Sequence, residues 1–139
     1  MDKIGKYRIL ISLALIDDYL DYSEEAFLFK IASLENVSGD DIKKLIEEER
    51  SGEAKADLEF NLTFDEKIEI LTDLIRVMKV DGKVFDAEVK FCERIAGTLG
   101  FDQKAIGFLS GNINIDPNNS TALAKIQYRM KKYLVMDDL

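Results

Sequence analysis

Two acidic side chains in the segment "KVDGKVFDAEVKF" have the type and spacing of cation ligands. When Glu88 is placed at position 12 of an EF-hand calcium loop, Asp81 falls at position 5 and Gly82 at position 6, as such a loop requires. Val77 and Lys79 then occupy positions 1 and 3, where their side chains cannot coordinate calcium. The segment is therefore not an EF-hand, although its two carboxylates remain candidate ligands.

A turn between two helices would bring these two carboxylates together. Seven residues along one continuous helix span about 10.5 Å, which is too far for two carboxylates to share a small cation. Gly82 can adopt positive φ and end the first helix, so that Asp86 caps the next helix and Glu88 lies in its first turn. Two interpretations of Asp81 remain open. It either accepts a backbone N–H in a local turn, or it holds magnesium or calcium together with Glu88 and waters.

The same acidic pair recurs earlier in the chain. A gapless shift of 64 positions aligns Asp17 with Asp81, and the same shift aligns Glu24 with Glu88. Apolar positions at helical spacing also coincide, including Phe27 with Phe91, Ile31 with Ile95, and Ile42 with Ile106. If the two copies pack about a pseudo-twofold axis, the four carboxylates face one another and need a cation or protons to coexist. The predicted metal ligands are thus Asp17, Glu24, Asp81 and Glu88.

Each copy of the predicted repeat, residues 3–46 and 67–110, has the pattern of three helices. Ser23 and Ser38 are expected N-caps, the "TFDE" segment has the spacing of a capping box, and Gly100 is expected to end a helix. The alternative to a true internal duplication is chance, because any two pairs of amphipathic helices have some identical residues at equivalent positions. The expected helices span about 3–19, 24–35, 39–49, 64–80, 87–99 and 103–110.

Two further segments lie outside the repeat. Residues from about 47 to 63 are charged and weakly periodic, which predicts a linker, and a last helix is expected over about 119–135 with Asn119 or Ser120 as its cap. That helix is basic, with Lys125, Arg129, Lys131 and Lys132 and no acidic residue between 120 and 136. It is either a docking surface for an acidic partner or a solvated face. In the second case its attraction to the acidic remainder of the chain would hold the two halves together.

Composition limits the fold and the chemistry. The chain has 139 residues, one proline and 8 glycines, which predicts one all-α domain over residues 1–139, a compact bundle of about seven helices. With no histidine, a Ser-His-Asp triad, a Cys-His pair and a His-Glu-His zinc site are impossible. No nucleotide-binding glycine motif is present. Cys92 lies beside apolar helix positions, so we expect a buried, inert thiol.

Charge and hydropathy limit the partners and the location. The net charge of −8 would repel nucleic acid and anionic membrane surfaces, so neither is an expected partner. No apolar run reaches the roughly 18 to 20 residues that span a bilayer, and the N-terminal segment lacks the features of a signal peptide. We expect a cytoplasmic protein that is not inserted in a membrane.

The pattern "VDGKVFDAE", after "LTDLIRVMK" and before "VKFCERIAGTLGF", resembles the TerB-like tellurite-resistance family of bacterial proteins. The resemblance implies a compact all-helical domain of two similar halves, a cytoplasmic role in metal-oxyanion resistance or stress, and acidic residues that bind metal. Asp81 and Glu88 match the family's D-G-x-[IV]-x-x-x-E pattern, whereas Asp17 and Glu24 match it only in their acids. The match covers about 64–110, and the linker and last helix have no counterpart in it.

Two functions therefore remain open. The first is a non-catalytic binding module that holds a divalent cation in its acidic turns and engages a protein partner. The second is a ligand-free helical adaptor or homodimer in which the acidic turns are purely structural. A carboxylate-dependent metal hydrolase is the weakest hypothesis, because the sequence offers no further ligands and no recognisable nucleophile. No certain cofactor is predicted.

Overall fold

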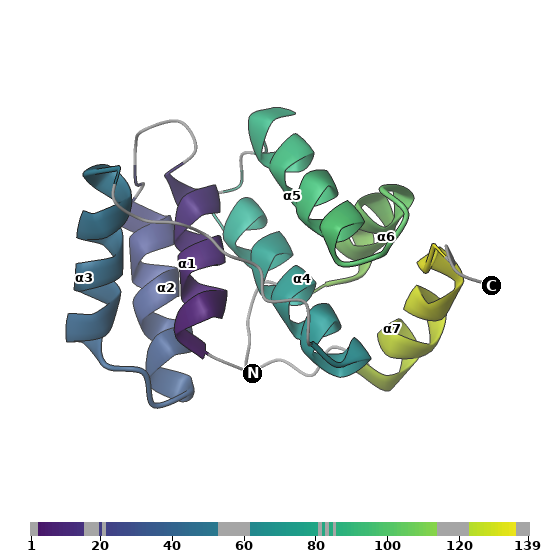
Figure 1. Ribbon diagram of the computed structural model, residues 1–139, viewed down its shortest axis with the longest axis horizontal. Coiled ribbons are helices and arrows are strands. Elements are labelled where there is room, and N and C mark those ends of the chain that lie inside the picture. The colour runs from purple at the N-terminus through teal and green to yellow at the C-terminus, as the bar shows by residue number, and fades with distance from the viewer. Residues whose placement is uncertain are drawn as a thin grey trace.

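The computed structural model is an all-helical bundle (Figure 1). It describes residues 3–15, 20, 22–52, 62–80, 82, 84, 86–113 and 123–135. Within these ranges there are seven α-helices, one 3-10 turn and no β-strand. The elements are α1 (Lys3–Ala14), α2 (Tyr22–Leu34), α3 (Gly39–Arg50), α4 (Phe64–Lys79), α5 (Asp86–Thr98), α6 (Lys104–Asn112), α7 (Leu123–Met130) and the 3-10 turn η1 (Lys131–Tyr133).

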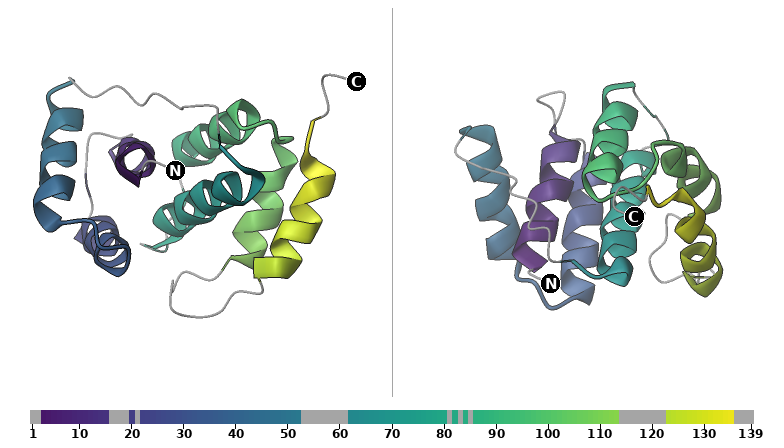
Figure 2. Two further views of the ribbon diagram at one scale, coloured as in Figure 1. Left: turned by 60° about the horizontal axis from the view of Figure 1, so that its bottom comes forward. Right: turned by 45° about the vertical axis from the view of Figure 1, so that its right-hand side comes forward.

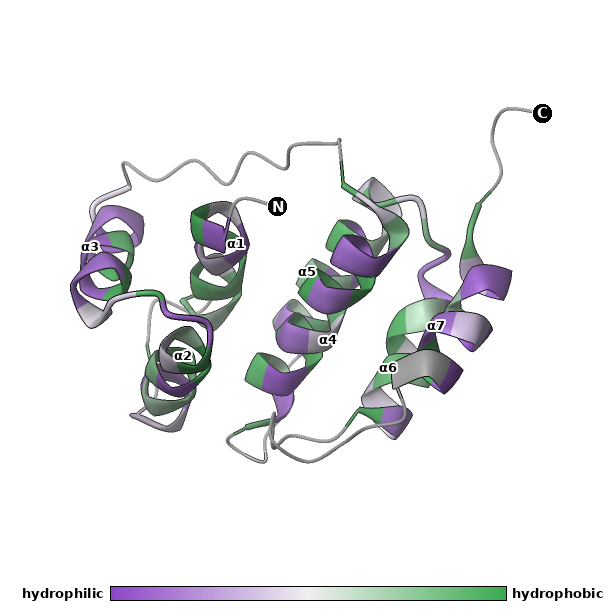
Figure 3. Ribbon diagram, turned by 90° about the horizontal axis from the view of Figure 1, so that it is seen from below, coloured by the Kyte–Doolittle hydropathy of each residue, from purple (hydrophilic) through white to green (hydrophobic). Residues whose placement is uncertain are grey.

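Two helices, α1 and α4, lie side by side at the centre of the molecule (Figures 1 and 2). The helix α1 packs against α2, α3, α4 and α5, whereas α4 packs against α1, α2, α5, α6 and α7. Because neighbours surround them, both helices bury most of their residues, among them Leu10 and Leu74, each fully buried. The peripheral helix α3 instead buries one stripe, Ile42, Leu45 and Ile46, and is largely polar elsewhere, as Figure 3 shows.

The two halves of the molecule have matching elements. Both ends of α5 lie 64 positions after the corresponding ends of α2. The contact of α1 with α5 is matched by the contact of α4 with α2, which is the reciprocal packing expected for two halves related by a pseudo-twofold axis. In Figure 1, α2 and α5 both begin at the upper end of the molecule. The first and second halves thus follow the same path through space.

Helices α2 and α5 also end in the same way. Two residues after each helix, Asn36 and Gly100 have positive φ angles of 61° and 91°. A Schellman hydrogen bond closes each turn. It runs from the N–H of Val37 to the carbonyl of Ala32 (2.8 Å), and from the N–H of Phe101 to the carbonyl of Ala96 (2.9 Å). Asparagine and glycine are the residues that adopt this backbone conformation most readily, so the local sequence accounts for both turns.

Several predicted helix boundaries are confirmed. The Ser38 hydroxyl accepts a hydrogen bond from the N–H of Asp41 and caps α3. Thr63 and Glu66 form the predicted capping box at the start of α4, with each side chain bonded to the backbone of the other residue. Gly82, after α4, has the expected positive φ of 77°. These boundaries depend on local chemistry, which the sequence displays directly.

Other predicted boundaries are wrong. The helix α1 ends at Ala14 instead of about residue 19, consistent with the cost of placing Asp17 and Asp18 at the negative end of a helix dipole. Ser23 lies inside α2, which begins one residue earlier, so it is not the N-cap. The predicted linker from residue 47 begins too early, because α3 continues to Arg50. Residues 16–19 and 53–61 lie outside the described part of the chain.

The last helix is shorter than predicted. It ends at Met130, and the following residues pair with the segment after α5. The N–H of Asp102 donates to the carbonyl of Tyr133 (2.6 Å), and the N–H of Val135 donates to the carbonyl of Gly100 (2.8 Å). These backbone bonds replace helical ones. The predicted caps, Asn119 and Ser120, lie outside the described residues.

Every helix in the described ranges is too short or too polar to traverse a lipid bilayer.

Candidate functional site

The predicted acidic site is only partly within the described residues. Glu24 and Glu88 are each the third residue of their helix, α2 and α5, and each is only 5% exposed. Each of the two residues takes part in an interaction with other groups of the protein. Asp17 and Asp81 lie outside the described residues, as does the residue that precedes Asp86 at the start of α5. The structure thus places two of the four predicted ligands in matching buried positions.

Cys92 lies one helical turn after Glu88 and is fully buried, as predicted. Burial raises the pKa of its thiol to about 12, and the negative charges of Glu88 and Glu93 add to this effect. The thiol is therefore protonated at neutral pH, which leaves no thiolate for nucleophilic attack or metal binding.

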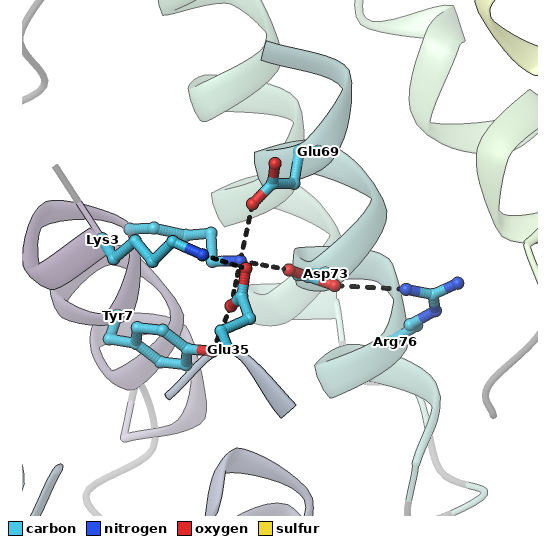
Figure 4. Close-up of polar contacts among 7 residues, drawn as sticks. Lys3, Tyr7, Glu35, Glu69, Asp73 and Arg76 are labelled. Atoms are coloured by element: carbon cyan, nitrogen blue, oxygen red, sulfur yellow. Dashed lines mark hydrogen bonds and ion pairs between the residues drawn. The ribbon is translucent and has the colours of Figure 1, made fainter. Parts of the chain in front are cut away.

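A different group of charged residues, which the sequence analysis missed, forms the most connected polar cluster in the described part of the chain. At its centre the ammonium of Lys6, on α1, is only 1% exposed. Figure 4 shows the carboxylates that converge on it, Glu69 and Asp73 from α4 and Glu35 from just after α2. The Lys6 Nζ atom lies 2.6 Å from Glu35 Oε1, 2.8 Å from Glu69 Oε2 and 2.8 Å from Asp73 Oδ2.

Local structure positions each of these three carboxylates. Glu69 and Asp73 are four residues apart on α4, so they lie on the same face of the helix, one turn apart. Glu35 belongs to the Schellman turn that ends α2, and the positive φ of Asn36 fixes the path of the chain there. Because α1 packs against both α2 and α4, Lys6 meets all three carboxylates.

Further residues complete the charge balance of this cluster. The Tyr7 hydroxyl donates a hydrogen bond to Glu35, and the ammonium of Lys3 lies 3.3 Å from the same carboxylate. Arg76 lies 3.3 Å from Asp73 on α4. We call these seven residues the lysine network. Its three cations balance its three carboxylates, and its members are Lys3, Lys6, Tyr7, Glu35, Glu69, Asp73 and Arg76.

The ionisation of the lysine network follows from these contacts. Burial opposes the charged form of Lys6, but the attraction of Asp73 and the three carboxylate hydrogen bonds outweigh it and raise the pKa of Lys6. Burial and the bond to Glu35 raise the pKa of Tyr7. Burial opposes ionisation of Glu35, but hydrogen bonds from Lys6 and Tyr7 lower its pKa. Lys6 is therefore a fixed cation and not a nucleophile.

The three carboxylates of the lysine network are close enough to hold a metal ion. One oxygen each from Glu35, Glu69 and Asp73 lies within 4.8 Å of the other two. The Lys6 ammonium already bonds to all three, so an incoming ion would have to displace a buried, fully paired cation. We therefore interpret this group as an ion-pair network that joins α1, α2 and α4.

Positions related to three charged residues of the lysine network by the shift of 64 residues have apolar side chains. The residues 64 positions away from Lys6, Glu35 and Asp73 are Ile70, Leu99 and Ile9, and all three are buried in the core. The fold therefore accepts apolar side chains at the positions that correspond to these three charged residues, whichever half they belong to. The mismatch was visible in the aligned sequence and is the signal that could have revealed the lysine network.

A surface cavity of about 220 Å³ adjoins the lysine network. Its walls combine the aliphatic side chains of α2 with the charged side chains of α4. Both kinds of neighbour are found in ligand pockets, but every charged group here already has a partner of opposite charge. The residues that line the cavity are Ile31, Leu34, Glu35, Glu69, Asp73 and Arg76.

Comparisons of the chain with protein-family models, with curated proteins and with solved structures found no match.

Proposed function

We propose that the chain is a non-catalytic binding module of the TerB-like kind, which holds a divalent cation at its acidic turns and engages a protein partner. The resemblance of the "VDGKVFDAE" segment supports this class, as does the correspondence of the two helical halves. A bacterial cytoplasmic setting and a role in metal-oxyanion stress follow from the same resemblance.

One observation carries the cation proposal, namely the burial of Glu24 and Glu88 at matching positions of α2 and α5. A buried carboxylate is costly unless hydrogen bonds, cations or a metal compensate its charge. The first turn of a helix offsets about 0.3 to 1 kcal/mol of that cost in exposed geometry, the interactions of each residue offset a further part, and a cation would add to both. Both helices begin at the same end of the molecule (Figure 1), and Asp17 and Asp81 precede them in the chain. Magnesium and calcium prefer such oxygen ligands.

Thermal melts with calcium, magnesium and manganese test the cation proposal. A cation that binds the folded state alone stabilises it by about 2.7 kcal/mol at a concentration of one hundred times its Kd. We expect one of the ions to raise the Tm of the wild type and to lose this effect in the Asp81→Asn/Glu88→Gln variant. Asp40→Asn/Glu47→Gln, on the exposed face of α3, removes the same charge and should respond like the wild type. An unresponsive wild type, or an equal response in all three proteins, would reject the proposal.

A ligand-free adaptor or homodimer is the alternative, and exposed apolar side chains on α2 favour it. Tyr22 is 84% exposed and Leu34 is 54% exposed. A second copy of the chain that covers these side chains would remove their apolar surface from water. Light scattering of the purified chain should then give a dimer mass that the Tyr22→Ser/Leu34→Ser variant reduces to that of a monomer. A wild type that stays monomeric at high concentration would count against this alternative.

A further inference from the structure

The helix α7 and the following η1 turn present a basic surface at the end of the molecule opposite α3 (Figure 1). Lys125, Arg129 and Lys132 recur at helical spacing and are all exposed. Tyr128, between them in the same stripe, is 77% exposed. We call Lys125, Tyr128, Arg129 and Lys132 the basic stripe.

In the part of the chain that the structure describes, ion pairs of the basic stripe do not hold α7 in place. The helix is anchored by Ile126, 4% exposed, and Met130, fully buried, and by the backbone bonds that follow it. Gln127 adds a hydrogen bond of 3.1 Å to Asp65 on α4. Among the described residues, no carboxylate forms an ion pair with any cation of the basic stripe. Ion pairs with the described part of the acidic remainder of the chain therefore do not explain these charges.

Aromatic rings lie next to the basic stripe. Phe108 of α6 stacks on Tyr133 of η1, with 5.7 Å between the ring centroids. The Arg129 guanidinium lies 5.8 Å from the Phe108 ring, and the Lys132 ammonium lies 5.6 Å from the Tyr133 ring. Cation–π contacts of this kind hold the two cations beside an apolar surface. The combined surface can accept carboxylates and an apolar side chain at the same time.

The charge of this region is opposite to that of the rest of the chain. Residues 123–135 contain four basic and no acidic residues, so a net charge of −8 for the whole chain leaves −12 outside this segment. Such separation of charge attracts a short acidic group to one end of the molecule only.

We propose that the basic stripe docks an acidic segment of a partner protein, in which carboxylates pair with Lys125, Arg129 and Lys132 and an apolar side chain packs near Tyr128. The inference rests on the proposed role of the chain as a binding module, for which it specifies the chemistry of the partner. It does not depend on a bound cation.

The size of the surface favours a protein segment over a larger polyanion. The eight residues of α7 span about 12 Å, a length that a few residues of peptide can cover. Duplex DNA carries about one charge per 1.7 Å and continues beyond the stripe, where it would meet the net negative charge of the rest of the chain. An anionic membrane also extends beyond the stripe and would meet the same negative charge.

Fluorescence anisotropy tests the proposal with the full chain and a short labelled peptide of alternating glutamate and phenylalanine. We expect saturable binding at physiological salt in the presence of EDTA, and about tenfold or greater loss in Lys125→Gln/Arg129→Gln/Lys132→Gln. Lys43→Gln/Lys44→Gln/Lys90→Gln changes the net charge equally at exposed sites elsewhere and should lose less than about twofold. Lys125→Arg/Lys132→Arg keeps the charge and should bind like the wild type.

Several results would overturn the proposal. They are an absence of peptide binding, an equal loss in the two glutamine variants, equal binding of a glutamine-phenylalanine peptide, and tighter binding of a DNA duplex or of phosphatidylserine vesicles. EDTA removes divalent cations from this assay, so its outcome is independent of the melts that test the cation site. Failure of one proposal is therefore distinguishable from failure of the other.

Discussion

The ammonium of Lys6 lies 2.8 Å from the carboxylate of Asp73, and this contact joins the central helix of the first half to the central helix of the second. Lys6 is inaccessible to solvent and Asp73 is nearly so, which makes the contact a buried ion pair. Removing one partner of such a pair leaves an uncompensated charge, whereas replacing the whole group by apolar residues is often neutral or stabilising. The lysine network can therefore be tested by comparing partial with complete replacement.

We predict that Lys6→Ile lowers the free energy of unfolding by about 3 to 5 kcal/mol, because three carboxylates lose their shared cation. Urea unfolding followed by circular dichroism measures the loss.

The matched variant replaces Lys6 and its most buried partners by apolar residues like those at the corresponding positions, Lys6→Ile/Tyr7→Phe/Glu35→Leu/Asp73→Ile. It should recover most of the stability that Lys6→Ile loses, since Ile70, Leu99 and Ile9 fill the corresponding positions. A combined variant as unstable as Lys6→Ile, or a loss below about 1 kcal/mol in the single variant, would contradict the account of the network.

The free energy of unfolding is predicted to fall both at acidic pH and at alkaline pH. The pKa of Glu35 is lowered in the folded state, so its contribution is complete above about 4.5 and is lost as the pH falls below that value. The pKa values of Lys6 and Tyr7 are raised, so their contributions are complete below about 10 and are lost as the pH rises further. Urea unfolding from pH 3 to pH 11 should give a plateau between these limits.

Glu35→Gln serves as the control for the acid limb of that profile. It should flatten the loss of stability below about pH 4.5, because the titrating carboxylate is gone. An unchanged acid limb in this variant would show that other carboxylates determine it.

The turn after α5 allows a clean test of backbone strain. Gly100 has a φ of 91°, and a Cβ atom there would meet no atom within 4 Å, so only the backbone opposes a side chain. We predict that Gly100→Ala lowers stability by about 1 to 2 kcal/mol. Gly97→Ala, in the helical part of α5 with the same open surroundings, should be neutral or stabilising by about 0.5 to 1 kcal/mol. Equal effects of the two substitutions in thermal melts would refute the role assigned to Gly100.

The sequence was sufficient for the features that depend on short-range chemistry. Apolar spacing indicated the helices, the Thr63–Glu66 spacing predicted a capping box, Gly82 predicted positive φ, and Gly100 predicted a helix end. Helix boundaries that depend on tertiary contacts could not be predicted from the sequence in the same way. The end of α7 is one example, because pairing of Tyr133 and Val135 with the segment after α5 replaces the last helical turn.

The lysine network was missed for a related reason. Lys6 interrupts the hydrophobic pattern of α1, but this interruption does not identify the carboxylates that pair with it. Its partners lie 29, 63 and 67 positions away, so they are known only once α1, α2 and α4 are packed. For the predicted acidic site, the burial of Glu24 and Glu88 at matching helix positions is observed, and the shared cation remains a prediction.

The most direct test of the central proposal is an NMR titration of the isotope-labelled chain with the ion that gives the largest thermal shift. Cation binding at the acidic turns predicts that the amide signals of residues 16–25 and 80–89 change together, with one apparent affinity and one stoichiometry, while the signals of Lys6 and Asp73 stay unchanged. Changes centred on Glu35, Glu69 and Asp73, or no changes up to millimolar cation, would contradict it.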